Sequence, residues 1–184
     1  MLWLIRHGET AWSLSGAHTG RTDLPLTAAG EEKAGAIREK LAGCSFSLVL
    51  TSPMQRARRT CELAGYMAAA KIDPNLLEWN YGSYEGRTTA DIQRERPGWS
   101  LFRDGLPDGE PIEHVAERAR AVIDRSAAAG GDVALFAHGH ILRILASCWM
   151  GLPPNDARLF ALSTASVSTL GYEHETRVIT RWNL

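Results

Sequence analysis

Two apolar runs of the chain end directly in residues that can do chemistry. "LWLI" is followed by Arg6 and His7, and "VALFA" is followed by His138, Gly139 and His140. Guanidinium groups match the oxygens of a tetrahedral oxyanion in two parallel hydrogen bonds. Neutral imidazole is a nucleophile that can form a covalent intermediate, and a second, protonated imidazole would stabilise charge on the phosphoryl oxygens. These residue types therefore predict chemistry on a phosphate group.

Two further segments add a cation and an acid. Arg56 lies in the first turn of a predicted helix after the apolar run "SLVL", and Glu78 follows the apolar residues "NLL". Because the carboxyl ends of parallel strands meet at one edge of a sheet, where ligands bind, we expect all four segments to converge there. Helix N-termini at that edge would attract an anion. A carboxylic acid would protonate the leaving alkoxide and then deprotonate water, so that such a site needs no metal ion.

Composition sets limits on the class of protein. The chain has 184 residues, 45% hydrophobic and 22% charged, with a net charge of -1, which predicts a single domain over 1–184. Nothing in this balance favours nucleic acid or a membrane surface as a partner. The three cysteines, Cys44, Cys61 and Cys148, have no CxxC spacing, which favours reduced thiols in a cytoplasmic protein over disulfides or structural zinc. No signal peptide is expected, and the apolar runs are too short for a membrane span.

The elements that must position these residues alternate between strand and helix. One helix is expected to begin with Ser52 as N-cap, Pro53 as first residue and Gln55 completing a capping box. Another, over 111–128, follows the 3.6-residue apolar period closely. The remaining expected elements are strands at 2–6, 46–50, 132–138, 158–162, 165–173 and 177–182, a long loop at 13–25, and helices at 27–43 (capped by Thr27), from Thr88 for one or two turns, and at 141–151. This order predicts a three-layer α/β/α fold with a mostly parallel central sheet.

Five motifs in this order resemble the histidine phosphatase superfamily, whose fold is phosphoglycerate-mutase-like. They are "RHGET", "GRTDLPLTAAG", "TSPMQRARRT", "LLEWNYGSYEG" and "FAHGH", and the resemblance covers roughly residues 3 to 183. A single motif would be weak, but five in order are specific. The resemblance implies a phosphohistidine mechanism without a cofactor, acting on a small phosphorylated substrate.

The resemblance also implies a role for individual residues. His7 would be the nucleophile, Glu78 the proton donor, and Arg6, Arg56 and His138 the groups that bind the transferring phosphoryl group. Ser13, Thr19 and Gly20 of the first long loop, with Gly139 and His140, would line the phosphate and substrate pocket. Ser13 stands where many members have asparagine, and Asn80 stands where relatives often have an acid.

Two positions favour hydrolysis over phosphoryl transfer between metabolites. Bisphosphoglycerate-dependent mutases carry an arginine and a lysine where this chain has Trp79 and Thr89, and they have a longer lid in the region of 87–110. Retention of a bisphosphate intermediate needs charge and exclusion of water. We therefore expect a phosphatase of the small branch that resembles sedoheptulose-bisphosphatase-like enzymes. The alternatives are a mutase dependent on 2,3-bisphosphoglycerate and a non-catalytic module that binds phospholigands.

The roles of several other residues are not fixed by the sequence. His140 would either contact substrate or cap the following helix. His18 could line the mouth of the pocket, but a surface position is preferred. Arg58 and Arg59 are expected on a solvated helix face. A zinc site built from His7, His138, His140 and Glu78 is disfavoured because the neighbouring arginines would repel a dication. The natural substrate and the oligomeric state, monomer or homodimer, are not predicted.

Overall fold

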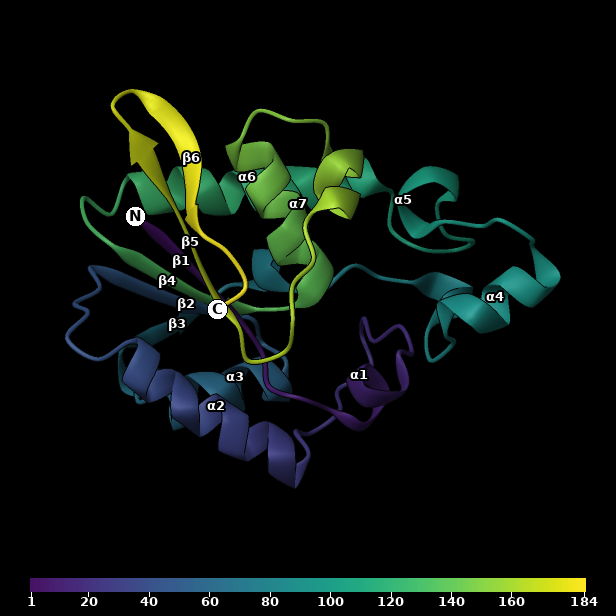
Figure 1. Ribbon diagram of the computed structural model, residues 1–184, viewed down its shortest axis with the longest axis horizontal. Coiled ribbons are helices and arrows are strands. Elements are labelled where there is room, and N and C mark those ends of the chain that lie inside the picture. Colours follow the sequence, from purple (N-terminus) through teal and green to yellow (C-terminus); the bar gives the residue numbers. More distant parts are fainter.

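The computed structural model describes residues 1–184 and has a six-stranded central sheet with the order β3-β2-β4-β1-β5-β6 (Figure 1). The pairs β3–β2, β2–β4 and β4–β1 are parallel, whereas β1–β5 and β5–β6 are antiparallel. The mostly parallel sheet is therefore confirmed. The strands are β1 (Leu2–Arg6), β2 (Leu48–Thr51), β3 (Ala70–Ile72), β4 (Val133–Ala137), β5 (Val167–Glu173) and β6 (Thr176–Arg181).

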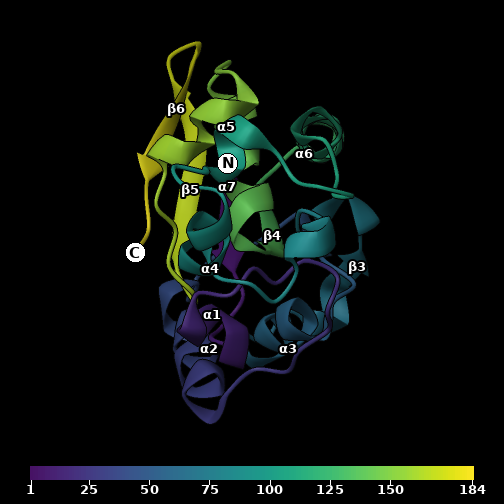
Figure 2. The ribbon, with the colours of Figure 1, turned by 90° about the vertical axis from the view of Figure 1, so that its right-hand side faces the viewer.

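Helices flank both faces of this sheet. Figure 1 shows α2 and α3 below it and α6 and α7 above it, while α1, α4 and α5 lie beyond one end. Figure 2 looks onto that end, where α1 and α4 lie in front of the sheet. The α-helices are α1 (Ala11–Ser15), α2 (Ala28–Lys40), α3 (Gln55–Leu63), α4 (Thr89–Glu95), α5 (Leu101–Asp104), α6 (Ile112–Ala127) and α7 (Gly139–Trp149), and short 3-10 helices cover Met67–Ala69, Pro74–Leu76, Gly82–Tyr84 and Pro154–Leu159.

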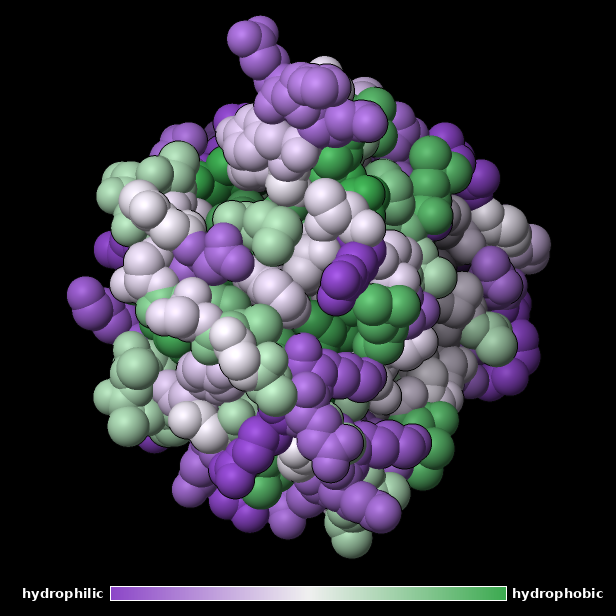
Figure 3. Space-filling view, turned by 60° about the vertical axis from the view of Figure 1, so that its left-hand side comes forward, coloured by the Kyte–Doolittle hydropathy of each residue, from purple (hydrophilic) through white to green (hydrophobic).

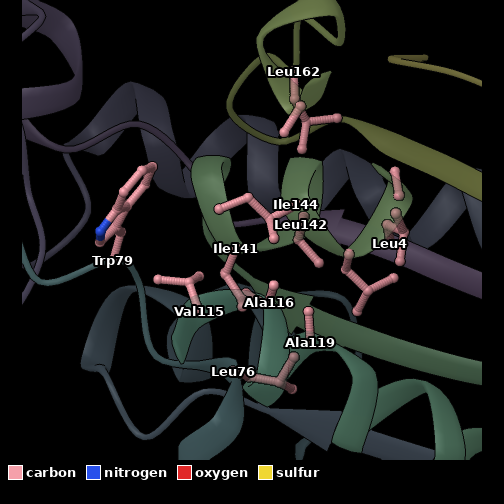
Figure 4. Packing of buried hydrophobic residues seen from close by; sticks show 14 of the residues in the cluster. Leu4, Leu76, Trp79, Val115, Ala116, Ala119, Ile141, Leu142, Ile144 and Leu162 are labelled. Carbon is pink, nitrogen blue, oxygen red and sulfur yellow. The ribbon is translucent and has the colours of Figure 1, made fainter. Parts of the chain in front are cut away.

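The core lies on both sides of the sheet because successive strand residues point to opposite faces. In β1, Leu2 and Leu4 join a cluster of 28 buried residues that includes α6 and α7, whereas Trp3 and Ile5 join a cluster of 11 on the side of α2 and α3. Figure 4 shows the larger cluster, with Ala116 of α6 close to Ile141 of α7. Burial on both faces explains why β1 and β4 read as continuous apolar runs.

Local signals account for several helix boundaries. The Thr27 side chain accepts a hydrogen bond from the backbone N–H of Gly30 at 2.9 Å, which confirms the expected cap of α2. The Thr88 side chain caps α4 in a reciprocal capping box with Asp91. Helix α6 covers Ile112–Ala127, as its apolar period predicts.

Three predictions of local structure are wrong. Helix α3 begins at Gln55 without a side-chain cap, because Ser52 is instead within hydrogen-bond distance of a histidine ring nitrogen. The segment 158–162 is not a strand; a 3-10 helix occupies Pro154–Leu159, with Pro153 as its N-cap and Pro154 as its first residue. The expected loop at 13–25 overlaps the end of α1, which is held by a capping box between Thr10 and Ser13.

None of the helices combines the length and the apolar character that a membrane crossing requires. Figure 3 shows one face of the molecule, on which hydrophilic and hydrophobic residues are interspersed.

Candidate active site

A cavity of about 230 Å³ lies beyond the carboxyl ends of β1 and β4. Seven of the ten residues predicted for the site line it: Arg6, His7, Ser13, Thr19, Glu78, Gly139 and His140. A larger hollow of about 490 Å³ lies between α2 and α3, but no histidine lines it, and its Arg59 is paired with Glu31 and Glu62. The smaller cavity is therefore the candidate site.

His7 follows β1 directly and is held as a neutral ring. Its Nδ1 lies 2.7 Å from the carbonyl oxygen of Gly8, which can only accept, so Nδ1 carries the proton. Burial, together with the positive charges of Arg6 and Arg56, lowers the pKa of His7 well below its ordinary value. The side chain is only 4% exposed, and Nε2 has no protein partner. A neutral imidazole with an available Nε2 lone pair on a cavity wall is suited to nucleophilic attack.

The loop after His7 is fixed by two close backbone contacts. The backbone N–H of Gly8 donates to Thr60 Oγ1 of α3 at 3.0 Å. A Cβ on Gly8 would lie 2.5 Å from the carbonyl oxygen of Gly30 in α2, and a Cβ on Gly30 would lie 2.2 Å from that of Glu9. Only glycine permits this approach, so α2 and α3 together set the position of the imidazole.

Arg6 brings a guanidinium to the same wall. Its NH1 donates to the carbonyl oxygen of Leu162, while its Nε is buried without any hydrogen-bond partner in the protein. A Cβ on Gly139 would lie 3.3 Å from the guanidinium carbon, so the absence of a side chain there leaves room for Arg6. The second terminal nitrogen, Nη2, also has no acceptor in the protein, and because Arg6 lines the cavity this nitrogen is available to a ligand oxygen.

His138 follows β4 and packs behind His7, with ring centroids 5.1 Å apart. Arg56 Nε donates to its Nδ1 at 3.0 Å, so the ring proton is on Nε2, which donates to Ser52 Oγ at 2.8 Å. Burial and the charge of Arg56 lower the pKa of His138 well below its ordinary value. The expectation of a protonated second histidine is therefore wrong for this arrangement.

Arg56 is fully buried and is not part of the cavity wall, nor is His138. The rest of its guanidinium donates to three backbone carbonyls, those of Thr22 at 2.9 Å, Gly20 at 2.9 Å and Thr19 at 3.3 Å. Arg56 thus ties the first long loop to the ring of His138 in this structure. Gly20 also lies off the wall, and its N–H donates to Glu85 at 2.9 Å.

Glu78 does not follow a strand directly, since the 3-10 helix Pro74–Leu76 precedes it. Its carboxyl group lies at the N-terminus of α7. Its Oε1 accepts from the backbone N–H groups of Trp79 and Ile141, and its Oε2 from that of His140, each at 2.9 Å. The carboxyl group is 4% exposed and lines the cavity. The helix that follows His138 therefore fixes the position of this acid.

The two departures from the family pattern have local roles. Ser13 Oγ donates to the carbonyl of Thr10 at 3.0 Å and accepts from its N–H at 2.8 Å, although the residue lines the cavity. Asn80 Oδ1 accepts from the N–H of Gly82 at 3.1 Å, which fixes the turn after Trp79. Both side chains are therefore engaged in local hydrogen bonds to the backbone.

Seven residues outside the predicted set also line the cavity, and four of them have polar side chains: His18, Tyr81, Thr89 and Arg143. His18 is not a simple surface residue, because its ring packs 4.9 Å from that of Tyr81. Arg143 was missed, although its spacing of three residues from His140 places both on one helix face, which is a signal that sequence can give. No group of three or more His, Cys, Asp or Glu residues is arranged to hold a metal ion.

Comparison with known proteins gives a consistent result. The family model for the histidine phosphatase superfamily (branch 1) matches residues 2–184. The chain is 37% identical over 180 residues to an acid phosphatase of Mycobacterium tuberculosis, covering 96% of this chain and 88% of that protein. It is also 37% identical over 182 residues to sedoheptulose 1,7-bisphosphatase of Saccharomyces cerevisiae, covering 81% and 67%. A solved structure of an open reading frame product from Mycobacterium tuberculosis superposes with a TM-score of 0.94 at 36% identity, covering 100% and 96%.

Proposed function

This chain belongs to the histidine phosphatase superfamily (branch 1) and is a phosphatase, and from that premise we propose that His7 carries the phosphoryl group during hydrolysis of a small phosphomonoester. The observation that supports this most directly is the hydrogen bond between Nδ1 of His7 and the carbonyl of Gly8. It fixes the neutral tautomer in which Nε2 carries the lone pair, at the wall of the cavity.

In the first step, the Nε2 lone pair of His7 attacks phosphorus, and the bond from phosphorus to the leaving oxygen breaks. Glu78, in its protonated form, gives its proton to that oxygen, so that the product leaves as an alcohol. In the second step, water attacks the phosphohistidine and gives a proton to Glu78. The P–N bond breaks, which releases inorganic phosphate and restores His7 and the acid.

Hydrogen-bond donors with fixed positions stabilise the charge of the transferring phosphoryl group. Arg6 lines the cavity with a terminal nitrogen, Nη2, that has no protein acceptor, and α7 begins at Gly139 on the same wall. Donors that are fixed before the reaction stabilise developing charge without reorganisation. We assign Arg56 and His138 to the layer behind His7, where they would contact the phosphoryl group only after local rearrangement.

The position after the acid supports hydrolysis over a mutase reaction. Trp79 is buried, and its Nε1 donates to the carbonyl of Glu110 at 2.7 Å, so this position gives no cation to the cavity. Thr89 lines the cavity but carries no charge. A bound bisphosphate intermediate would lack the cations that these positions supply in a mutase.

A panel of phosphomonoesters, assayed with and without EDTA, tests this function. We expect release of inorganic phosphate that EDTA does not change, and loss of release in a His7→Ala variant. A parallel assay with 3-phosphoglycerate separates the alternative, because isomerisation faster than phosphate release would show a mutase. Binding of phosphate esters without any turnover would show a non-catalytic module instead.

The compartment is a further part of this proposal. Cys44, Cys61 and Cys148 are all unpaired, which supports a reducing, cytoplasmic environment. Localisation of a tagged chain by fractionation tests it.

A further inference from the structure

The α7 wall of the cavity carries two side chains that the phosphatase mechanism does not use. His140 and Arg143 lie three residues apart on α7, and both line the cavity beside Glu78. Residues with this spacing lie on one helix face. They therefore form a single patch next to the reacting centre.

Arg143 is held in place by one of its five N–H donors, and the other four have no acceptor in the protein. Its Nε donates to the carbonyl oxygen of Ala157 at 3.1 Å, and its guanidinium carbon lies 4.9 Å from the centroid of the Phe102 ring. Its two terminal nitrogens have no acceptor in the protein, and no carboxylate forms an ion pair with it. A guanidinium that is fixed at Nε and stacked on a ring presents the rest of its fork to a ligand.

Tyr81 determines which ring nitrogen of His140 carries the proton. The Tyr81 hydroxyl lies 2.6 Å from Nδ1 of His140, and Tyr81 is 2% exposed. The hydroxyl has no other acceptor, so it donates to Nδ1, because the opposite arrangement would leave a buried O–H without a partner. The proton of the neutral ring is then on Nε2, which has no protein partner. His140 is thus fixed as a hydrogen-bond donor.

The patch formed by these two residues consists of donors alone. The Nε2–H of His140 and the terminal N–H groups of Arg143 are all donors, and an ionised carboxylate or a phosphate is a group that only accepts. The one carboxyl group of the cavity, Glu78, already accepts three backbone hydrogen bonds. Arg6 lies on the same wall and serves the transferring phosphoryl group, so the charge of Arg143 is left for a second anionic group.

From this arrangement we propose that Arg143 and His140 form a second subsite, which binds an acidic group on the alcohol part of the substrate, with Tyr81 as the positioning residue for His140. The proposal rests on the phosphatase function given above. The cavity, about 230 Å³, is small beside typical ligand pockets of about 300–1,000 Å³. The acidic group therefore lies only a few bonds from the phosphate that is removed.

Matched substrates that differ in one charge test the subsite. In 3-phosphoglycerate, a carboxylate replaces the terminal hydroxymethyl group of glycerol 3-phosphate, and glycerol 1,3-bisphosphate adds a phosphate to that same terminal hydroxyl. We expect kcat/KM to be higher for the member of a pair with the additional acid, by about ten- to a hundredfold, because hydrogen bonds to charged groups are worth about 1.5–3 kcal/mol. The pair with the larger difference shows whether the second group is a carboxylate or a phosphate.

Substitution of Arg143 separates recognition from chemistry. Arg143→Met is expected to remove most of this preference through a higher KM, and to change kcat/KM for glycerol 3-phosphate by no more than about threefold. Arg143→Lys should restore part of the preference. Arg58→Met removes an exposed arginine of α3 that forms no ion pair, and it should leave kcat/KM for both members of each pair unchanged. Tyr81→Phe is expected to reduce the preference and to make it depend on pH, because the ring of His140 can then change tautomer or take up a proton.

Equal rates for both members of each pair in the wild type, or an equal loss for both in Arg143→Met, would overturn the subsite while the phosphatase function stood. If no substrate were hydrolysed, the proposed phosphatase reaction would be rejected. Calorimetric titration would then still test whether the subsite binds an acidic group. The probes are then 2-phosphoglycolate and ethyl phosphate, titrated into the wild type and Arg143→Met. Selective loss of 2-phosphoglycolate binding in the variant supports the subsite, and equal binding in both proteins rejects it.

Discussion

The Nε–H of Arg56 donates to Nδ1 of His138 over 3.0 Å, in the interior and away from the cavity wall. This contact joins α3 to the end of β4, and the remaining donors of Arg56 join both to the loop of Thr19, Gly20 and Thr22. His138 continues the chain of hydrogen bonds to Ser52 at the end of β2. One buried guanidinium therefore fixes the neutral form of His138 and holds together three segments that surround His7.

Replacement of Arg56 by methionine should be strongly destabilising. It removes the partner of three backbone carbonyls and of Nδ1 of His138, all in the interior. We expect the free energy of unfolding to fall by about 3 kcal/mol, in the range found for broken buried charge networks. Arg58→Met on the same helix is the control, with an expected change within about 0.5 kcal/mol. Urea unfolding of both variants measures this, and equal stabilities would contradict the role of Arg56.

The stability of the protein should fall as the pH is lowered from 7 to 5. Burial lowers the pKa of His7, His18, His138 and His140 in the folded state. The unfolded chain therefore binds more protons below about pH 6.5, so the free energy of unfolding rises with pH in this window. Each of these histidines adds at most about 1.4 kcal/mol per pH unit.

Urea unfolding between pH 5 and 7 checks the sign and the source of this slope. His140→Asn should reduce the slope by about a quarter, since it removes one of the four groups with a lowered pKa. His114→Asn removes an exposed histidine of α6 and should leave the slope unchanged. Stability that rises on acidification in this window would show that the buried rings are charged in the folded state.

Two glycines of α2 should respond to alanine with opposite signs. A Cβ on Gly30 would lie 2.2 Å from the carbonyl oxygen of Glu9, whereas a Cβ on Gly35 would meet nothing within 4 Å. Gly35→Ala is expected to stabilise the protein by up to about 1 kcal/mol, from helix propensity alone. Gly30→Ala should destabilise it by more than that and lower kcat, because the loop that holds His7 must move. Thermal unfolding and phosphate release measure both effects, and similar behaviour of the two variants would contradict the close contact proposed at Gly30.

The role of Glu78 as proton donor predicts a dependence on the leaving group. In Glu78→Gln the alkoxide must leave without a proton, so kcat for an alkyl phosphate should fall by about a hundred- to ten-thousandfold. Hydrolysis of p-nitrophenyl phosphate should fall less, because nitrophenolate leaves easily without protonation. Steady-state rates for the two esters test this. An equal loss for both esters would show that Glu78 instead positions the N-terminus of α7, from whose N–H groups it accepts hydrogen bonds.

The convergence of strand ends could be predicted from sequence, whereas the contacts around them could not. Arg6 ends β1, and His7 and His138 follow β1 and β4 directly. The apolar runs before them identify both the strands and the edge of the sheet. The neutral state of His138 depends on Arg56 Nε, and the position of Arg143 depends on the carbonyl of Ala157. These partners lie in segments whose placement depends on tertiary packing rather than on local pattern.

Prolines and competing side chains explain the local errors. Ser52 has the right type and spacing for a helix cap, but its hydroxyl serves His138, and α3 begins at Gln55. Pro153 and Pro154 begin a 3-10 helix that covers Pro154–Leu159, although the apolar pattern of 158–162 predicts a strand. In both cases a long-range or backbone constraint outweighs the local signal.

The phosphohistidine mechanism is tested most directly by locating the covalent phosphoryl group. The enzyme is mixed with phosphorus-32-labelled p-nitrophenyl phosphate, quenched in alkali, digested and sequenced by mass spectrometry, with His7→Ala and His114→Ala treated in parallel. We predict alkali-stable, acid-labile label on His7 in the wild type and in His114→Ala, and none in His7→Ala. Turnover without label on His7, or label that persists in His7→Ala, would rule out His7 as the nucleophile.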